Sequence, residues 1–271
     1  MNALDSLRNG DVQATLEILK QDVRKAPRDA RLRTFLFQMF CISGEWDRAL
    51  TQLSVAAELD PLALPMAQTY RSVIRCELLR EKVFRGETSP TVLGDPGPWL
   101  PSLIEASRLL AAGQPDAAAR LRDTAFEAAP ETAGSLDDAP CAWIADADPR
   151  LGPVLEVIVG GNYMWVPFIR IHALKLEAPA DLRDQVWMPA HFTWTNLGEA
   201  DGFVPTRYPG SATAPDPALA LSRRTEWQVI SADWSLPFGQ RVLVTDVQET
   251  ALMDVRNLTL TPACAPAASP G

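Results

Sequence analysis

The first half of the chain carries apolar side chains at the three- and four-residue spacing of amphipathic helices. One stripe lies in GEWDRALTQLSVAAELDP and consists of Trp46, Ala49, Leu50, Leu53 and Ala57. Gly44 allows the chain to turn before this stripe, and Pro61 ends it because proline cannot continue a helix. The pattern therefore predicts a helix between Gly44 and Pro61.

This glycine-to-proline unit occurs three times. It runs from Gly10 to Pro27, from Gly44 to Pro61 and from Gly113 to Pro130, and the first two copies are offset by 34 residues. A second apolar segment between Pro27 and Gly44 supplies a partner helix. Helix pairs with this period resemble tetratricopeptide repeats. Position 78, where the next glycine is due, holds leucine, so we expect one continuous helix from about Leu64 to Phe84.

The pattern changes after Pro130. Short segments rich in β-branched and aromatic residues follow, bounded by Gly, Pro, Asn or Asp: VLEVIVGG, HFTWTN, GFVPTRY, TEWQVIS, RVLVTDV and VRNLTLT. Such segments predict strands of a mostly antiparallel sheet. LRDQVWMP, DPALALS and the surroundings of Ala142 are expected to form short helices.

The chain is thus predicted to be α+β, with N-terminal tetratricopeptide-like helical repeats followed by a small, mostly antiparallel α+β domain. We expect the repeat domain at residues 1–135 and the α+β domain at 136–260. The low-complexity end TPACAPAASPG predicts a disordered tail at 261–271.

Charge and composition exclude several classes of protein. The formal net charge of −9 leaves no basic excess for binding nucleic acid or an anionic membrane surface. No apolar run is long enough to span a membrane, and the N-terminus lacks the features of a secretory signal. The four scattered cysteines contain no C-x-x-C pair, which favours unpaired thiols in a reducing compartment. We therefore expect a cytoplasmic protein.

The sequence contains no recognisable catalytic motif. His172 and His191 stand apart, with no partner at the spacing of metal ligands. Nucleophile elbows, phosphate-binding glycine loops and dinucleotide fingerprints are all missing from the sequence. We therefore expect a protein that is not an enzyme and uses neither a cofactor nor a metal.

One cluster of polar and aromatic residues allows two interpretations. VPTRYPGS places Arg207 and Tyr208 near the segments SRRTEW and GQR. Arginines beside aromatic rings are able to bind an anionic ligand, in a ligand-binding or enzymatic C-terminal domain. They are equally able to pair with carboxylates and loop carbonyls. The structural interpretation is favoured because no nucleophile or base accompanies the arginines.

A series of motifs in order resembles the ImpE/SciE-type family, also called TagJ. The series is GNYMWVPFIRI, DLRDQVWMPA, RYPGS, SRRTEW, GQR and LMDVRNL. The residues of this series that we expect to act structurally, called the signature residues below, are Arg207, Tyr208, Pro209, Gly210, Arg224, Glu226, Trp227, Gln240 and Arg241. The family usually continues RYPGS with glutamate, whereas this chain has Ala212; Glu226 or Asp216 then substitutes for the missing carboxylate, or the loop is looser.

The resemblance implies a cytoplasmic, non-enzymatic accessory part of a bacterial type VI secretion system. Its implied partner is the N-terminal helix of the small contractile-sheath subunit (TssB/VipA), and its implied effect is on how the disassembly ATPase handles the sheath. An amphipathic helix of this kind fits the groove of a helical repeat array.

Tetratricopeptide-like geometry predicts which side chains face that groove. They are Arg31, Thr34, Gln38, Cys41, Leu100, Leu103 and Ser107. Two alternatives stay open: the array packs against the chain's own second half, or the C-terminal face holds the partner helix. The oligomeric state does not follow from the sequence.

Overall fold

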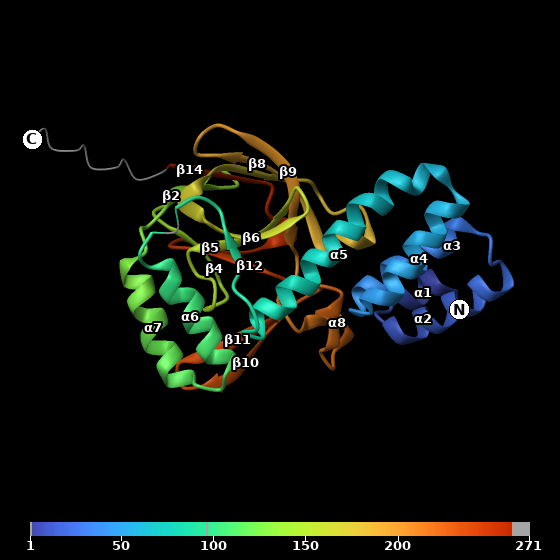
Figure 1. Ribbon diagram of the computed structural model, residues 1–271, viewed down its shortest axis with the longest axis horizontal. Helices are drawn as coiled ribbons and strands as arrows, with labels where there is room; N and C mark the ends of the chain where they lie inside the picture. Colours follow the sequence, from blue (N-terminus) through green and yellow to red (C-terminus); the bar gives the residue numbers. More distant parts are fainter. Residues whose placement is uncertain (1, 96, 262–271) are drawn as a thin grey trace, which may run out of the picture.

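The computed structural model describes residues 2–95 and 97–261, so the predicted tail lies outside the described residues from position 262 onward. The fold is α+β, as predicted. A lobe of helices forms one end of the molecule, strands and a further helix pair form the other, and the helix α5 (Leu64–Phe84) runs between them (Figure 1).

The N-terminal lobe consists of α1 (Ala3–Arg8), α2 (Val12–Lys25), α3 (Ala30–Ile42), α4 (Trp46–Leu59), the short helix η1 (Pro61–Ala63) and α5. Side-chain caps begin several of these helices. Asp11 accepts a hydrogen bond from the main chain of α2, and Asp29 accepts two from α3. These caps satisfy amide groups that a helix leaves unpaired in its first turn. The predicted continuous helix from Leu64 to Phe84 is confirmed by α5.

The third helix pair stands apart from the first lobe. It consists of α6 (Leu100–Ala111) and α7 (Pro115–Ala128), and the strand β1 (Thr91–Val92) separates it from α5. The helices lie beside β11 (Trp234–Gly239), where Trp234 packs with Ala118 and Ala119 of α7 (Figure 1). The helices α1 to α7 are therefore interrupted by a segment that joins the sheet, and the resemblance to tetratricopeptide repeats stays a prediction.

A nine-stranded sheet forms the centre of the second half, in the order β1-β6-β5-β9-β8-β7-β14-β2-β3. Among the strand pairs of this sheet in the described residues, β1–β6 alone is parallel, so the predicted mostly antiparallel character is confirmed. The strands not yet given are β2 (Ala133–Leu136), β3 (Ala139–Cys141), β5 (Val154–Val159), β6 (Asn162–Pro167), β7 (Ile171–Leu176), β8 (Trp187–Trp194), β9 (Glu199–Pro205) and β14 (Asn257–Thr261).

Two smaller sheets complete the fold. One has the order β13-β12-β4 and consists of β4 (Ile144–Asp146), β12 (Val242–Thr245) and β13 (Glu249–Ala251); the other pairs β10 (Thr225–Ser231) with β11. Short helical segments link the strands: η2 (Phe168–Arg170), η3 (Leu182–Gln185), η4 (Ser211–Thr213), α8 (Pro217–Ala220) and η5 (Leu252–Asp254). The segments η3 and α8 lie in the predicted LRDQVWMP and DPALALS.

The helix expected around Ala142 was a wrong prediction. This segment holds β3 and β4 instead, and the amide of Ala142 donates to the carboxylate of Asp246. The strand β3 forms a hairpin with the neighbouring β2, and β4 pairs with β12, which is distant in the sequence.

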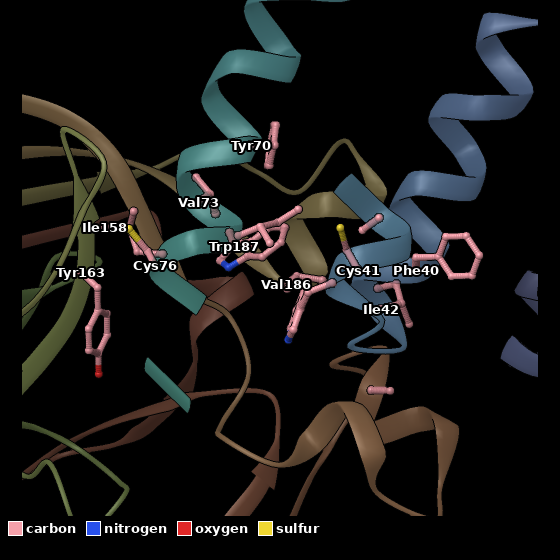
Figure 2. Packing of buried hydrophobic residues seen from close by; sticks show 14 of the residues in the cluster. Phe40, Cys41, Ile42, Tyr70, Val73, Cys76, Ile158, Tyr163, Val186 and Trp187 are labelled. Atoms are coloured by element: carbon pink, nitrogen blue, oxygen red, sulfur yellow. The ribbon is translucent and has the colours of Figure 1, made fainter. Parts of the chain in front are cut away.

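The largest hydrophobic core is built from both halves of the chain. Figure 2 shows Trp187 of β8 lying between α5 and the end of α3, with Val186 beside Cys41. The rings of Trp46 and Trp187 lie 5.8 Å apart, as do those of Tyr70 and Trp187. The hydrophobic core therefore continues across the point near residue 135 where helices give way to strands. The division into two domains at that point stays a prediction.

Candidate functional site

Arg207 connects the sheet to two helix ends. It follows β9 and is buried, and its guanidinium donates to the carbonyls of Cys41 (2.7 Å), Ile42 (2.7 Å) and Ala220 (2.6 Å). The residues Ile42 and Ala220 end α3 and α8, where carbonyl groups have no partner inside the helix. Burial lowers the pKa of Arg207 to about 10, which keeps the side chain charged at neutral pH. Arg207 thus caps two helix C-termini with a positive charge.

The rest of the RYPGS turn packs onto β11 and β12. The Tyr208 hydroxyl donates to the Asp146 carboxylate and accepts from the amide of Val242 (2.9 Å). Ser211 Oγ donates to the carbonyl of Tyr208 and accepts from the amide of Gly239. Gly210 has φ +85°, and a Cβ there would lie 2.9 Å from the Phe238 ring. The turn therefore requires glycine at this position.

Below the turn lies a network of buried charges around Glu156, in the middle of β5. Arg80 of α5 donates to Glu156 through Nε (2.7 Å) and Nη2 (2.9 Å), and to Glu77 through Nη1 (2.8 Å). Arg241 pairs with Glu156 and with Asp146. The Tyr163 hydroxyl donates to Glu156 (2.6 Å). Forked contacts of this kind hold buried charges in one geometry.

Proton affinities in this network follow from burial and from the neighbouring charges. Burial disfavours the ionised form of Glu156, but the guanidiniums of Arg80 and Arg241 outweigh it and lower the pKa to about 2. Asp146 has the single guanidinium of Arg241 as an ion partner and lies near Asp148. Burial therefore dominates there and raises the pKa of Asp146 to about 6.

The signature residues separate into an interior and an exterior set. Arg207, Tyr208 and Arg241 are buried, as is Gln240, whose amide nitrogen donates to the carbonyl of Ser222. Arg224 and Glu226 lie at the surface, where Arg224 pairs with both Glu226 and Asp216. Trp227 is 47% exposed. Asp216 and Glu226 thus supply carboxylates close to the turn in which Ala212 replaces the family's usual glutamate.

A cleft of about 400 Å³ lies beside the turn, lined among others by Arg80, Arg150, Arg207 and Tyr208. Arg80 and Arg207 direct their donors to internal acceptors, as described above. Arg150 binds the Asp148 carboxylate (2.9 Å from Nε) and lies 4.7 Å above the Phe84 ring. A fourth arginine of the cleft, Arg85, lies at the surface and pairs with Glu81 and Glu87. The other three arginines act as internal donors, which favours the structural interpretation of the cluster over an anion site.

The predicted partner-binding residues are placed very differently from one another. Cys41, Leu100 and Leu103 are fully buried in the core, and Ser107 is also buried. Their side chains contact the interior of the protein itself. Their predicted contact with a partner is not available in this conformation.

The other three predicted residues lie toward the surface of α3. Arg31 is exposed, Thr34 is half-buried, and Gln38 is half-buried with its amide donating to Asp181 (3.1 Å) just before η3. Beside it, Arg183 of η3 lies 4.7 Å above the Tyr70 ring of α5. The chain's own η3 thus lies against the C-terminal half of α3, while the N-terminal half carries the accessible residues. Their partner-binding role stays a prediction.

Several members of the buried network were missed by sequence reasoning. Glu156 could have been found, because it is a carboxylate inside the apolar run VLEVIV. A charged residue in a buried strand almost always has an ion partner. Glu77 and Arg80 have the (i, i+3) spacing of an ordinary surface pair on a helix. Nothing in their local sequence indicates that they are buried.

Across residues 2–95 and 97–261, no group of three or more His, Cys, Asp or Glu side chains is arranged to hold a metal ion. His191 contacts Asp201 (2.8 Å) at the surface. Within the same residues, no helix has both the length and the apolar character needed to cross a membrane.

Comparisons with known proteins place the chain in a family. Residues 138–259 match the family model for ImpE protein. The chain is 48% identical over 262 residues to the type VI secretion system accessory component TagJ of Pseudomonas aeruginosa, covering 97% of this chain and 92% of that protein. The crystal structure of protein VPA1032 from Vibrio parahaemolyticus has a TM-score of 0.88 at 27% identity, over 96% of this chain and 97% of that one. Because the identity to TagJ extends through both the helices and the sheet, this chain belongs to the ImpE family of type VI secretion accessory components.

Proposed function

We propose that this protein is a non-enzymatic adaptor in the cytoplasm that binds the N-terminal helix of the small sheath subunit (TssB/VipA) and thereby modulates handling of the sheath. The observation that carries the proposal is the 48% identity to an accessory component of type VI secretion along nearly the whole chain. The internal use of the buried arginines supports a non-enzymatic role, since it removes the donors that an anion site would require.

The binding surface we propose is the accessible N-terminal half of α3. Arg31 and Thr34 lie there, and Gln38 marks the point where η3 begins to cover the helix. The lobe also exposes Leu62 (89%) in η1 and Leu64 (45%) at the start of α5. A lobe that exposes both polar groups and leucines suits the two faces of an amphipathic helix. The buried Cys41, Leu100, Leu103 and Ser107 have no part in this surface.

Anisotropy of a labelled peptide with the sequence of the sheath subunit's first helix tests the surface. Thr34→Arg places a long charged side chain in its middle and is expected to weaken binding by about tenfold or more. Thr51→Arg is the matched control, because both threonines donate to the carbonyl four residues earlier at 2.9 Å and Thr51 lies on α4. Equal affinities of the two variants would exclude α3 as the binding surface.

A pull-down with full-length proteins tests the partner itself. A sheath subunit that lacks its first helix is expected to lose binding to the wild-type chain. Undiminished capture of the truncated subunit contradicts the proposal. If the partner helix binds normally to Thr34→Arg but not to a variant with a surface substitution in the sheet, the site lies on the C-terminal half instead.

A further inference from the structure

The strand β10 has an unpaired edge that differs from the other outer strands of the described residues. It is seven residues long and pairs only with β11. The outer strands β1, β3, β4 and β13 have two or three residues each, and β3 contains Pro140. The six-residue β11, which is the other strand of this sheet, contains Pro237 and packs on α7 through Trp234. Short length and proline are the usual protections against pairing with another chain. Among these edges, β10 lacks both.

The side chains of β10 are as unusual as its length. Trp227 is 47% exposed, Val229 73% and Ile230 45%, and no charged residue stands between Trp227 and Ile230. A groove of about 560 Å³ beside the strand is lined by Trp227 with Leu219 and Phe238. Exposed apolar side chains on a long free edge are typical of a strand that pairs with another chain.

The hydrogen-bond pattern shows which main-chain groups are free. The amide of Gln240 donates to the carbonyl of Arg224, which makes Thr225 and Gly239 a non-hydrogen-bonded pair. The register then makes Trp227 and Pro237 a non-hydrogen-bonded pair too, in agreement with the missing amide hydrogen of proline. The amide and carbonyl groups of Thr225, Trp227 and Val229 consequently point away from β11, toward the free edge.

We propose that this edge pairs with the same edge of a second copy of the chain, forming an antiparallel dimer about an axis at Gln228. Trp227 then lies opposite Val229 of the second copy, and the outward groups of the two residues form ladder hydrogen bonds. This pair and its symmetry-related pair, Val229 opposite Trp227 of the second copy, each combine an aromatic with a β-branched side chain. Such side chains are favourable cross-strand neighbours. The register also keeps Glu226 away from Glu226 of the second copy.

Charge at the ends of the strand favours the same arrangement. Arg223 precedes β10 and donates to the main-chain carbonyls of Leu7 (2.8 Å) and Arg8. Asp233 follows it in the turn to β11. Neither side chain has an ion partner within the described residues, and antiparallel pairing about Gln228 places the segment before β10, which carries Arg223, beside the turn of the second copy that carries Asp233. A parallel arrangement would bring like charges together.

Light scattering after size-exclusion chromatography, over a series of concentrations, tests the dimer. The wild type is expected to dimerise, and Val229→Lys is expected to raise the dimer dissociation constant by about tenfold or more. Val247→Lys is the matched control, because Val247 is 59% exposed in the turn between β12 and β13 and should leave the dimer intact. A wild type that stays monomeric up to roughly 0.1 mM overturns the proposal, as does an undisturbed dimer of Val229→Lys.

Cross-linking tests the register without relying on a destabilising change. Opposite residues in a non-hydrogen-bonded antiparallel pair lie close enough for a disulfide, so Gln228→Cys should form a covalent dimer under mild oxidation. Both cysteine variants carry Cys264→Ser, and Cys41, Cys76 and Cys141 are buried and should stay reduced. Gln248→Cys, an exposed glutamine in the turn next to β13, is the control and should remain monomeric on a denaturing gel. Equal cross-linking of the two variants, or none of Gln228→Cys, overturns the register.

Discussion

The interior and exterior signature residues differ in which kind of side chain lies in the unfavourable environment. Around Arg207 and Arg241, full charges lie in the core and each is matched by carbonyls or carboxylates. Around Trp227, apolar side chains lie in water without a cover. A motif shared by a family therefore need not mark one site. The interior part holds the helical lobe on the sheet, while the exterior part offers surface to another molecule.

Removing Arg241 should produce the largest effect in this comparison. Arg241→Met leaves Asp146 and Glu156 buried with one cation fewer, and breaking a buried pair from one side costs about 3–5 kcal/mol. Urea unfolding monitored by circular dichroism measures the loss. A variant as stable as the wild type would mean that the network is not structural.

Acid should distinguish the two carboxylates that share Arg241. The folded-state pKa of Glu156 is about 2, below its ordinary 4.5, so its contribution is present above pH 4.5 and is lost as the pH falls toward 2. This loss is on the order of 3 kcal/mol. Asp146 acts in the opposite sense, since its folded-state pKa of about 6 exceeds the ordinary 3.8. Its contribution is present below 3.8 and is lost as the pH rises through 6.

Urea unfolding at steps between pH 2.5 and 7 should therefore show a maximum of stability in the range where Glu156 is ionised and Asp146 is still protonated. Glu156→Gln is expected to flatten the acid side of this curve. An unchanged acid side in this variant would assign the loss to other carboxylates.

Replacing Arg207 should have a smaller but clear effect. Arg207→Met removes the donor from the carbonyls of Cys41, Ile42 and Ala220. Buried carbonyls left without a donor should lower the free energy of unfolding by about 1–3 kcal/mol. The melting temperature should fall accordingly. A melting temperature equal to that of the wild type would instead favour a ligand-binding role for Arg207 at the neighbouring cleft.

Replacing Arg224 in the exterior set should have the smallest effect. Its side chain is 51% exposed and pairs with Asp216 and Glu226, a kind of contact that contributes about 0–1 kcal/mol. Arg224→Met should therefore unfold almost as the wild type does, under the conditions used for Arg241→Met. A loss as large as that of Arg241→Met would erase the distinction between the two sets.

Local patterns predicted the helices α2 to α7 and the strands β5, β8, β9, β10, β12 and β14. Leucine at position 78 in place of a turn glycine was enough to predict α5, because helix continuation depends on neighbouring residues. The strand β1 was missed because its two residues are extended only through pairing with β6. Ala142 was placed in a helix because the composition of its loop carries no information about pairing with β2 and β12.

Site residues were harder to predict because burial is a property of the whole fold. Arg207 was expected to act structurally, but its acceptors at Cys41 and Ile42 lie far away in the sequence. Leu100 and Leu103 have the spacing of a helix stripe, and such a stripe looks the same whether it faces a partner or the core. Only the packing of η3 against α3 indicates which part of that helix is accessible.

The helix α5 has a mechanical consequence. Its 21 residues extend over about 30 Å without a break, with one end in the N-terminal lobe and the other fixed by Arg80 to β5. A solenoid of separate helix pairs flexes at each turn, whereas this helix acts as a rod shared by both regions. A molecule that binds the lobe therefore meets a surface already held in place, and little conformational entropy is lost to closing a hinge.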